Sequence, residues 1–267
     1  MSCYLCGSDK YTIRQTGVRD DPLINVHECL GCGLVYLSYF EHVPNRVHRF
    51  RDIKTWEEHT AQDDIRRAYQ FEDVTINKDV LDLGCGNGGF IRHAIAKSAC
   101  GIEIDQKAIT YCIAHNTPVY GSLDEVGTFD VITMFHVIEH IPDPIGLLKE
   151  LSTHLNDGGK VVIETPNSDD ALLTLYECSE FSEFTYWSEH PFLFNRDTLF
   201  SVAANAGYIV EKIEQYQRYP LANHLYWLSQ GKPNGHSEWS CIRDTHYSQS
   251  LAALNKCDTI IAILEKP

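Results

Sequence analysis

Residues 78–90 read KDVLDLGCGNGGF, an apolar stretch that runs directly into a glycine-rich loop. The strand residues are Val80, Leu81 and Leu83, and the loop glycines are Gly84, Gly86, Gly88 and Gly89. Glycines let the backbone turn sharply and approach a ligand closely because they carry no Cβ. Residues 91–97 are predicted to continue as a helix. A strand, a glycine loop and a helix N-terminus together predict a cradle for a nucleotide-like ligand in an α/β fold.

Two classes of ligand compete for this loop. Gly84, Gly86 and Gly89 satisfy the G-x-G-x-x-G fingerprint of nicotinamide dehydrogenases, which is a weak signal by itself. Asp82 would sit badly beside a pyrophosphate but suits a cationic aminoacyl sulfonium. A second strand over 99–104 carries Glu103, which can accept both ribose hydroxyls in either class, and Asp105 is the competing acid. The position of Asp82 favours the sulfonium.

The rest of the chain alternates strands and helices. Further strands are predicted at 118–120, 129–135, 160–165, 208–213 and 259–264, with a helix at 143–155. Alternation of this kind is typical of a parallel sheet covered by helices.

Residues 80–88 resemble motif I of the class I S-adenosylmethionine-dependent methyltransferases. The blocks FHVIEHIPDP (135–144), NDGGKVVIETPN (156–167) and EHPFLFNRDTLFSVAANAGY (189–208) follow in the order of the group that includes ubiquinone-biosynthesis, sugar and polyketide methyltransferases. The resemblance covers roughly residues 79–207. It implies a Rossmann-like, seven-stranded, mostly parallel sheet with an antiparallel last strand.

The resemblance also implies the contacts to S-adenosylmethionine. The cofactor-binding residues would be Asp82, Gly84, Cys85, Gly86, Asn87, Gly88, Glu103, Ile104, Ser122, Leu123, Phe135 and His136. Ser122 stands where these families often have an aspartate, and Leu123 is expected to pack on the adenine ring.

Residues 136–140, HVIEH, also match the inverted zinc-protease motif, which needs an uninterrupted helix. Here the motif follows a predicted strand and is closed by Ile-Pro-Asp-Pro, which argues against that helix. The resemblance places Glu139 and His140 beside the substrate. Some ubiquinone-pathway relatives are thought to hold a divalent cation at the positions that correspond to His136, Glu139 and His140, so the resemblance implies a second metal site there. As general base we predict His140, then His190, then His136. The alternative role of these histidines is hydrogen-bonded support of the loop.

Near the amino end, two C-x-x-C-G knuckles are separated by 22 residues. Cys3, Cys6, Cys29 and Cys32 suit tetrahedral zinc, and strands at 11–16 and 24–28 would complete a zinc ribbon. Four thiolates leave no open coordination position, so the zinc is predicted to be structural. His27 is an alternative ligand with poorer spacing. Redox chemistry at one C-x-x-C is disfavoured because no βαβ unit surrounds it.

The predicted domains are the ribbon (1–41), a connecting helical segment (42–74) and a methyltransferase domain (75–267) with an aromatic-rich insertion at 216–256. The helix predicted at 54–72 is either a flap over the cofactor or a packing helix. The insertion, together with residues 181–194, which contain Tyr186, Trp187 and His190, is the candidate acceptor pocket. A homodimer interface is the competing interpretation.

Composition narrows the function. The formal charge of −15 disfavours nucleic acid, because the only basic clusters, at 46–51 and 66–67, are short. No signal peptide or membrane-length apolar run is visible, so a cytoplasmic protein without a membrane partner is expected. The leading hypothesis is O-methylation of a sugar, nucleotide-sugar or phenolic metabolite. An RNA base methyltransferase and a catalytically silent cofactor-binding module are the alternatives.

Overall fold

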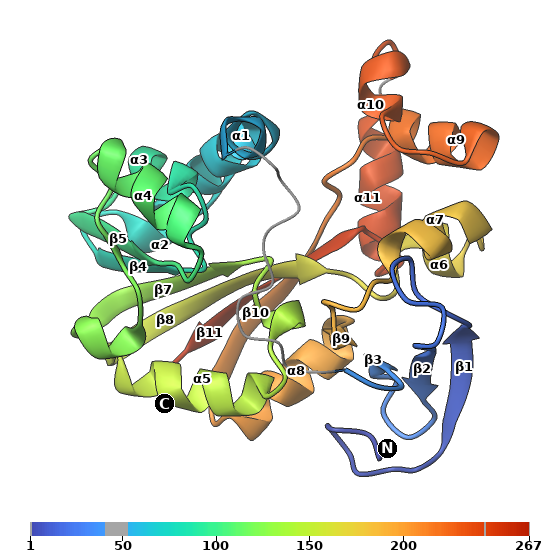
Figure 1. Ribbon diagram of the computed structural model, residues 1–267, viewed down its shortest axis with the longest axis horizontal. Coiled ribbons are helices and arrows are strands. Elements are labelled where there is room, and N and C mark those ends of the chain that lie inside the picture. Colours follow the sequence, from blue (N-terminus) through green and yellow to red (C-terminus); the bar gives the residue numbers. More distant parts are fainter. Residues whose placement is uncertain (1, 41–52, 243, 267) are drawn as a thin grey trace.

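The computed structural model describes residues 2–40, 53–242 and 244–266, and its centre is a seven-stranded sheet (Figure 1). The strand order is β10-β11-β8-β7-β4-β5-β6. The strands are β4 (Asp79–Leu83), β5 (Ser98–Ile102), β6 (Val119–Tyr120), β7 (Phe129–Phe135), β8 (Leu155–Pro166), β10 (Ile209–Tyr216) and β11 (Thr259–Glu265). Within this sheet, β11 alone runs against its neighbours. The predicted Rossmann-like fold with its antiparallel last strand is therefore confirmed.

Alternate residues of the strands pack under helices on the two faces of the sheet. Ile132 and Met134 of β7 join a cluster with residues of α5 (Pro144–Thr153) and α8 (Arg196–Asn205). Val131 and Phe135 face the other side, with residues of α1 (Ile53–Gln70) and α3 (Gly89–His93). This period of two is expected of strands that are buried on both faces. None of the helices in the described ranges is long and apolar enough to cross a membrane.

The amino-terminal residues form a second sheet that the central domain completes. Its order is β1-β2-β3-β9, with β1 (Tyr11–Gln15), β2 (Val26–Cys29), β3 (Val35–Leu37) and β9 (Phe192–Leu193). The predicted pairing of 11–16 with 24–28 corresponds to β1 and β2. β9 comes from the later part of the chain, so the ribbon is docked by strand pairing. The domain boundaries stay a prediction, and residues 41–52, with the 46–51 basic cluster, lie outside the described residues.

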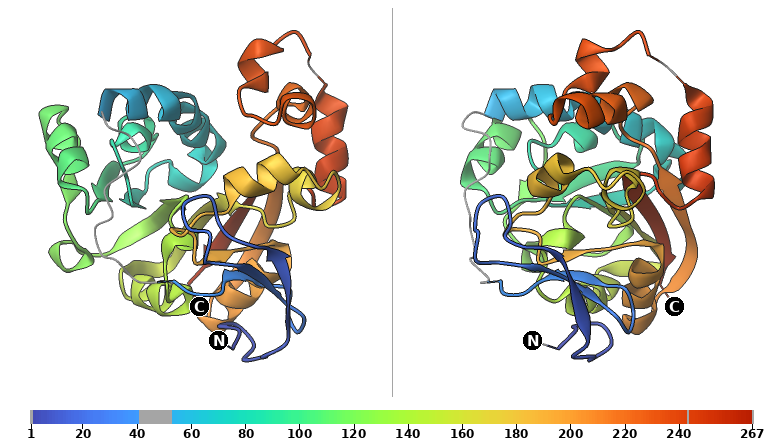
Figure 2. Two further views of the ribbon diagram at one scale, coloured as in Figure 1. Left: turned by 45° about the vertical axis from the view of Figure 1, so that its right-hand side comes forward. Right: turned by 90° about the vertical axis from the view of Figure 1, so that its right-hand side faces the viewer.

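One local prediction was wrong. The helix expected at 91–97 is only α3, which ends at His93, because the chain returns to the sheet where Lys97 N bonds to Lys78 O at 2.9 Å. The insertion at 216–256 holds three helices, α9 (Leu221–Gln230), α10 (Gly235–Glu238) and α11 (Thr245–Ala253). Figure 2 shows α6 (Ala171–Thr174) and α7 (Ser179–Thr185) between this insertion and the ribbon. The remaining helices are α2 (Glu72–Thr75) and α4 (Gln106–Ala114), with 3₁₀ turns η1 (Leu123–Glu125) and η2 (Ile138–His140).

Candidate active site

The glycine loop lies at the carboxyl end of β4, beside the acid that follows β5. Gly84, Gly86 and Gly88 have φ of +71°, +55° and +75°, values that favour glycine. A Cβ at Gly84 would lie 2.6 Å from Cγ2 of Val137. The Glu103 carboxylate accepts a hydrogen bond from the Gly86 amide at 2.8 Å, whereas Asp105 caps α4. The glycine loop and Glu103 are thus joined by a hydrogen bond, and a nucleoside site requires both of them side by side.

Helix α1 covers this loop. The Trp56 ring lies 2.7 Å from where a Cβ at Gly86 would stand, so only glycine lets the helix approach so closely. Asn87 Nδ2 donates to Thr60 Oγ1 at 3.0 Å, and Arg92 pairs with Glu57 at 2.8 Å. Helix α1 therefore packs directly on the glycine loop, where a flap over the cofactor site would lie, and its role as a flap stays a prediction.

The other predicted cofactor residues fall into two groups. Ile104 is 66% exposed beside the loop, an apolar surface that an adenine ring could cover, and Ser122 and Leu123 lie at the start of η1. Cys85 is buried against Ile91 and Cys112. The Phe135 ring packs between Phe71 and Phe90, with centroid distances of 5.7 and 4.9 Å. The Phe135 ring thus belongs to the core, and a contact of this residue with the cofactor stays a prediction.

Asp82 is buried inside β4. Thr133 Oγ1 of β7 donates to its carboxylate at 2.7 Å. Burial raises the pKa of Asp82 to about 7, and the hydrogen bond from Thr133 lowers it only in part. A nearby cationic ligand would favour the ionised form of this side chain.

A buried charge network borders the loop, and most of its members were missed from the sequence. Glu164, at the carboxyl end of β8, accepts hydrogen bonds from Arg66 at 2.8 and 2.9 Å and from Arg67 at 2.6 and 3.1 Å. Burial would raise the pKa of Glu164, but His136 and the two guanidinium groups hold it well below its usual value. Arg218, which follows β10, pairs with Asp63 of α1. In the sequence, the features that could have indicated this network were the adjacent Arg66 and Arg67 and the acid Glu164 at a strand end.

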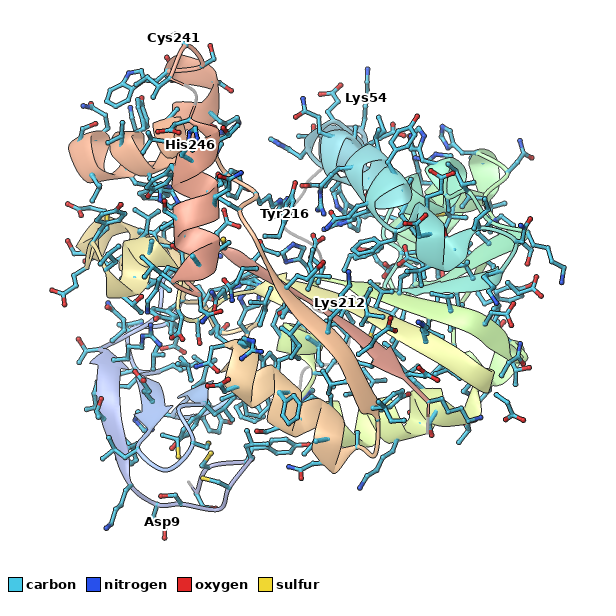
Figure 3. All side chains as sticks on the ribbon, turned by 180° about the vertical axis from the view of Figure 1, so that it is seen from behind. Asp9, Lys54, Lys212, Tyr216, Cys241 and His246 are labelled. Carbon is cyan, nitrogen blue, oxygen red and sulfur yellow. The ribbon has the colours of Figure 1, made fainter. Side chains whose placement is uncertain are left out.

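Tyr216 joins this network at the end of β10. Its ring lies under the Arg66 guanidinium, 4.6 Å from centroid to Cζ, and Figure 3 shows it between the insertion and the sheet. Together with the Arg218 to Asp63 pair, this contact ties α1 to the beginning of the insertion.

His136 lies among carboxylates at the end of β7. Its φ of +58° is unusual for a residue with a Cβ, and such strain is often found at functional sites. Nδ1 lies 3.2 Å from Glu139 Oε1, and Nε2 lies 3.5 Å from Glu164 Oε1. Burial alone would lower the pKa of His136, but these two carboxylates raise it. Burial would also raise the pKa of Glu139, yet its imidazole neighbours lower it to about 2. His136 is thus placed to hold a proton rather than to take one.

His140 and His190 lie together on the other side of Glu139. The ring centroids of His140 and His190 are 4.5 Å apart, and His140 Nδ1 lies 2.8 Å from the carbonyl oxygen of Glu189. Glu139, His140 and His190 each offer a ligand atom, and these atoms lie within 4.8 Å of one another. These three side chains can relay a proton or hold a divalent cation. The cation site expected from the sequence had His136 as its third member, whereas the structure brings His190 to Glu139 and His140. The H-x-x-E-H stretch forms only η2, so the helix of the zinc-protease motif is not formed.

The cysteine cluster is assembled as predicted. Ligand atoms of Cys3, Cys6, Cys29 and Cys32 lie within 4.8 Å of one another. The sulfur separations of 3.6 Å (Cys3 to Cys32) and 3.4 Å (Cys6 to Cys29) are close to the roughly 3.8 Å of a tetrahedral zinc–thiolate site. Gly7 and Gly33 turn with φ of +71° and +78°. His27 is stacked on Tyr11 at 3.8 Å, outside this group. The four cysteines therefore fit zinc, and His27 is not needed.

The predicted acceptor pocket is only partly assembled. Trp187 lies 5.0 Å from His190 between ring centroids, on the side of the two histidines. Tyr186 is instead buried in the ribbon cluster with Val26, Val35 and Leu193. In the insertion, His224 and Trp227 are also buried, and His224 Nδ1 is 2.7 Å from the Tyr247 hydroxyl. The buried side chains of Tyr186, His224 and Trp227 thus serve packing rather than acceptor binding.

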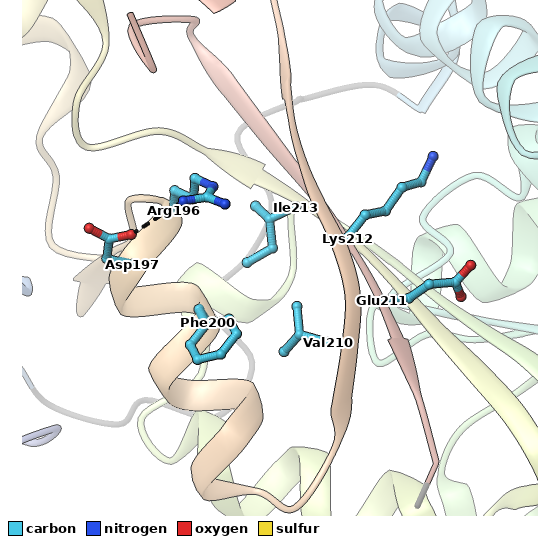
Figure 4. Close-up of a pocket in the computed structure, with 7 residues that line it drawn as sticks. All are labelled: Arg196, Asp197, Phe200, Val210, Glu211, Lys212 and Ile213. Atoms are coloured by element: carbon cyan, nitrogen blue, oxygen red, sulfur yellow. Dashed lines mark ion pairs between the residues drawn. The ribbon is translucent and has the colours of Figure 1, made fainter. Parts of the chain in front are cut away.

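A separate hollow of about 360 Å³ lies between α8 and β10 (Figure 4). Its lining consists of Arg196, Asp197, Phe200, Val210, Glu211, Lys212 and Ile213. No member of the glycine loop or of the histidine group contributes to this lining. The hollow is therefore not part of the candidate active site.

Comparison with known proteins supports the sequence resemblance. The sequence model of the methyltransferase domain family matches residues 39–213, more than half of the 267 residues. The ubiquinone biosynthesis O-methyltransferase of Ralstonia nicotianae is 30% identical over 103 residues, which cover 33% of this chain and 43% of that protein. The Acinetobacter baylyi protein of the same name is 25% identical over 153 residues, covering 46% of this chain and 63% of that protein. The chain thus spans about half the length of the curated relatives it matches.

Solved structures share the fold. An S-adenosylmethionine-dependent methyltransferase from Archaeoglobus fulgidus has a TM-score of 0.52 at 18% identity, covering 80% of this chain and 95% of that one. A chain from the complex of the Haloferax volcanii Trm112 methyltransferase activator with a methyltransferase has a TM-score of 0.56 at 14% identity, covering 80% and 93%. At these identities the likeness shows the fold alone.

Proposed function

Because this chain belongs to the methyltransferase domain family and has the class I fold, we propose that it transfers a methyl group from S-adenosylmethionine to a hydroxyl group of a small molecule. One observation carries the proposal. The glycine loop follows β4, Glu103 follows β5, and Glu139 and His140 follow β7, and these three strands are neighbours in the sheet. His190 joins Glu139 and His140 from the segment before β9. A donor and a proton acceptor can therefore meet at one edge of the sheet.

The chain's own residues supply alignment and a base. S-adenosylmethionine, when bound, would supply an electrophilic methyl carbon for in-line attack by the acceptor oxygen, with S-adenosylhomocysteine as the leaving group. Glu103 and the loop amides hold the nucleoside, and α1 excludes water from above it. The Nε2 atom of His140 takes the proton that the hydroxyl loses, since Nδ1 is engaged by the Glu189 carbonyl. His190 and Glu139 position the acceptor and stabilise the imidazolium that forms.

The acceptor is proposed to be a sugar, nucleotide-sugar or phenolic metabolite. The names of the relatives favour a small hydroxylated acceptor. RNA is disfavoured by the net charge of −15 and by the Arg66-Arg67 pair, whose side chains are 18% and 7% exposed and bind Glu164. We further propose that Cys3, Cys6, Cys29 and Cys32 hold a structural zinc ion.

Incubation with methyl-labelled S-adenosylmethionine and a cell extract tests this function. The extract is divided by ultrafiltration into a small-molecule fraction and a macromolecular fraction, and the labelled product is identified by mass spectrometry. We expect the label in the small-molecule fraction. Label in ribonuclease-sensitive material would favour the RNA alternative, and cofactor binding without labelled product in either fraction would favour the silent module.

Asp82 gives cofactor binding a predictable pH dependence. The carboxyl of the free protein is largely neutral below pH 7, and the sulfonium favours its ionised form, so binding below pH 7 must release a proton. Affinity for S-adenosylmethionine should therefore rise by up to about tenfold per pH unit towards pH 7 and level off above it. Calorimetry should find little slope for S-adenosylhomocysteine, which lacks the charge, or for the Asp82→Asn variant. Equal slopes for both ligands would contradict this role of Asp82.

A further inference from the structure

The segment between α7 and β9 sets the orientation of His140. The carbonyl oxygen of Glu189 lies 2.8 Å from His140 Nδ1. A carbonyl can only accept, so neutral His140 must carry its proton on Nδ1 and keep Nε2 as the acceptor. The next residue, His190, places its ring against that of His140. Any displacement of this segment would therefore change both histidines.

The ribbon holds this segment just before Glu189. Both carboxylate oxygens of Asp20 accept from Ser188, one from its amide at 2.9 Å and one from its hydroxyl at 2.6 Å. Arg19 N donates to the Tyr186 carbonyl at 3.0 Å, and the Arg19 guanidinium lies 4.7 Å from the centroid of the Trp187 ring. These contacts come from the loop between β1 and β2, which rises beside α7 in Figures 1 and 2.

The ribbon also holds the segment just after His190. Leu37 N donates to the Pro191 carbonyl at 3.0 Å, and β3 pairs with β9 through Tyr36 to Phe192 and Val35 to Leu193. Glu189 and His190 are thus the two residues between two anchors, and both anchors belong to the ribbon. A ribbon that only covered the core would need the pairing of β3 with β9, but it would not need the additional hydrogen bonds from Ser188 to Asp20.

We propose that the ribbon is a positioning element of the acceptor site, in which Arg19 and Asp20 fix the segment that sets the tautomer of His140. The proposal rests on the proposed function, in which the Nε2 atom of His140 is the base. The ribbon loop acts through Ser188 and Glu189 and does not itself contact the reacting atoms.

Nitrogen-15 NMR of histidine-labelled protein tests the proposal. The two ring nitrogens have distinct shifts in each tautomer, and the His140→Asn variant assigns the signals. The wild type should show His140 with Nδ1 protonated. In the variant that combines Arg19→Ala with Asp20→Ala, we expect mixed tautomers and a kcat for labelling of the small-molecule fraction that is lower by about tenfold, with KM for S-adenosylmethionine unchanged.

The controls separate this role from general stability. Asp9→Ala removes another ribbon carboxylate, at the far tip in Figure 3, and should behave as the wild type. Asp20→Asn keeps one acceptor for Ser188 and should restore most of the tautomer signal. The zinc content of each variant reports whether the ribbon stays folded. If the variant with both substitutions loses zinc, the Ser188→Ala variant tests the proposal instead, because it leaves the ribbon sequence intact. An unchanged His140 tautomer in a zinc-loaded variant would overturn the proposal. If His140 proves not to be the base, the tautomer shift should still occur, so the two failures are distinguishable.

Discussion

Replacement of His140 by asparagine should lower methyl transfer by about 10²- to 10⁴-fold, the usual contribution of a positioned general base. The Nδ2 of asparagine can replace Nδ1–H towards the Glu189 carbonyl, so the loop should stay in place while the proton acceptor is lost. Affinity for S-adenosylhomocysteine should stay within about twofold, because the glycine loop is held by contacts to α1 and Glu103. Single-turnover rates with the labelled product measure the first effect, and calorimetry measures the second.

His154 offers a matched control. Its Nδ1 also lies near a backbone carbonyl, 3.1 Å from Gly127 O, but it is a partly exposed residue at the carboxyl end of α5. His154→Ala should therefore keep the wild-type rate. If His140→Asn remains within threefold of the wild type while His140→Ala is inactive, His140 supports the loop and His190 becomes the leading base.

The cofactor half of the site could be predicted because its residues are close in sequence. The strand, the glycines and Glu103 fall within about 25 residues, and each has a local reason for its identity: burial, positive φ or a strand end. The cysteine cluster was predictable for the same reason, since the spacing within each knuckle identifies the ligands. Parallel strands then bring such local signals to one edge of a sheet.

The acceptor half depends on contacts that local patterns do not encode. Glu164 meets Arg66 and Arg67 across 98 and 97 residues, and the sequence alone indicated only a short basic cluster. Tyr186 and Trp187 are adjacent aromatics, yet one packs under the ribbon and the other faces the histidines. Pairing of the two-residue strand β9 with β3 links positions about 157 residues apart, and neither strand has enough residues for a periodic signal.

Loss of the zinc site should separate methyl transfer from cofactor binding. Cys6 is exposed, so Cys6→Ser removes a ligand with little change in packing. Structural zinc contributes about 10 to 16 kcal/mol in small peptide modules, so the ribbon should lose its fold without it. We expect the zinc content to fall from one ion per chain towards none. The rate of methyl transfer should fall by more than about tenfold, because the ribbon no longer holds the segment with Glu189 and His190 in place. Cys241→Ser, which changes an exposed cysteine at the tip of the insertion in Figure 3, should alter neither quantity.

Cofactor binding should survive this change, because the glycine loop is braced from the other side of the molecule. Trp56 and Thr60 of α1 and Glu103 after β5 hold the loop. The ribbon contacts given above instead reach β9 and the segment before it, and the Tyr4 hydroxyl accepts from Ile145 N at 3.0 Å. Affinity of Cys6→Ser for S-adenosylhomocysteine should therefore stay within about threefold of the wild type. Cofactor affinity that falls in step with transfer would show that the ribbon stabilises the whole domain, whereas full transfer by a zinc-free variant would show that the acceptor site needs no ribbon.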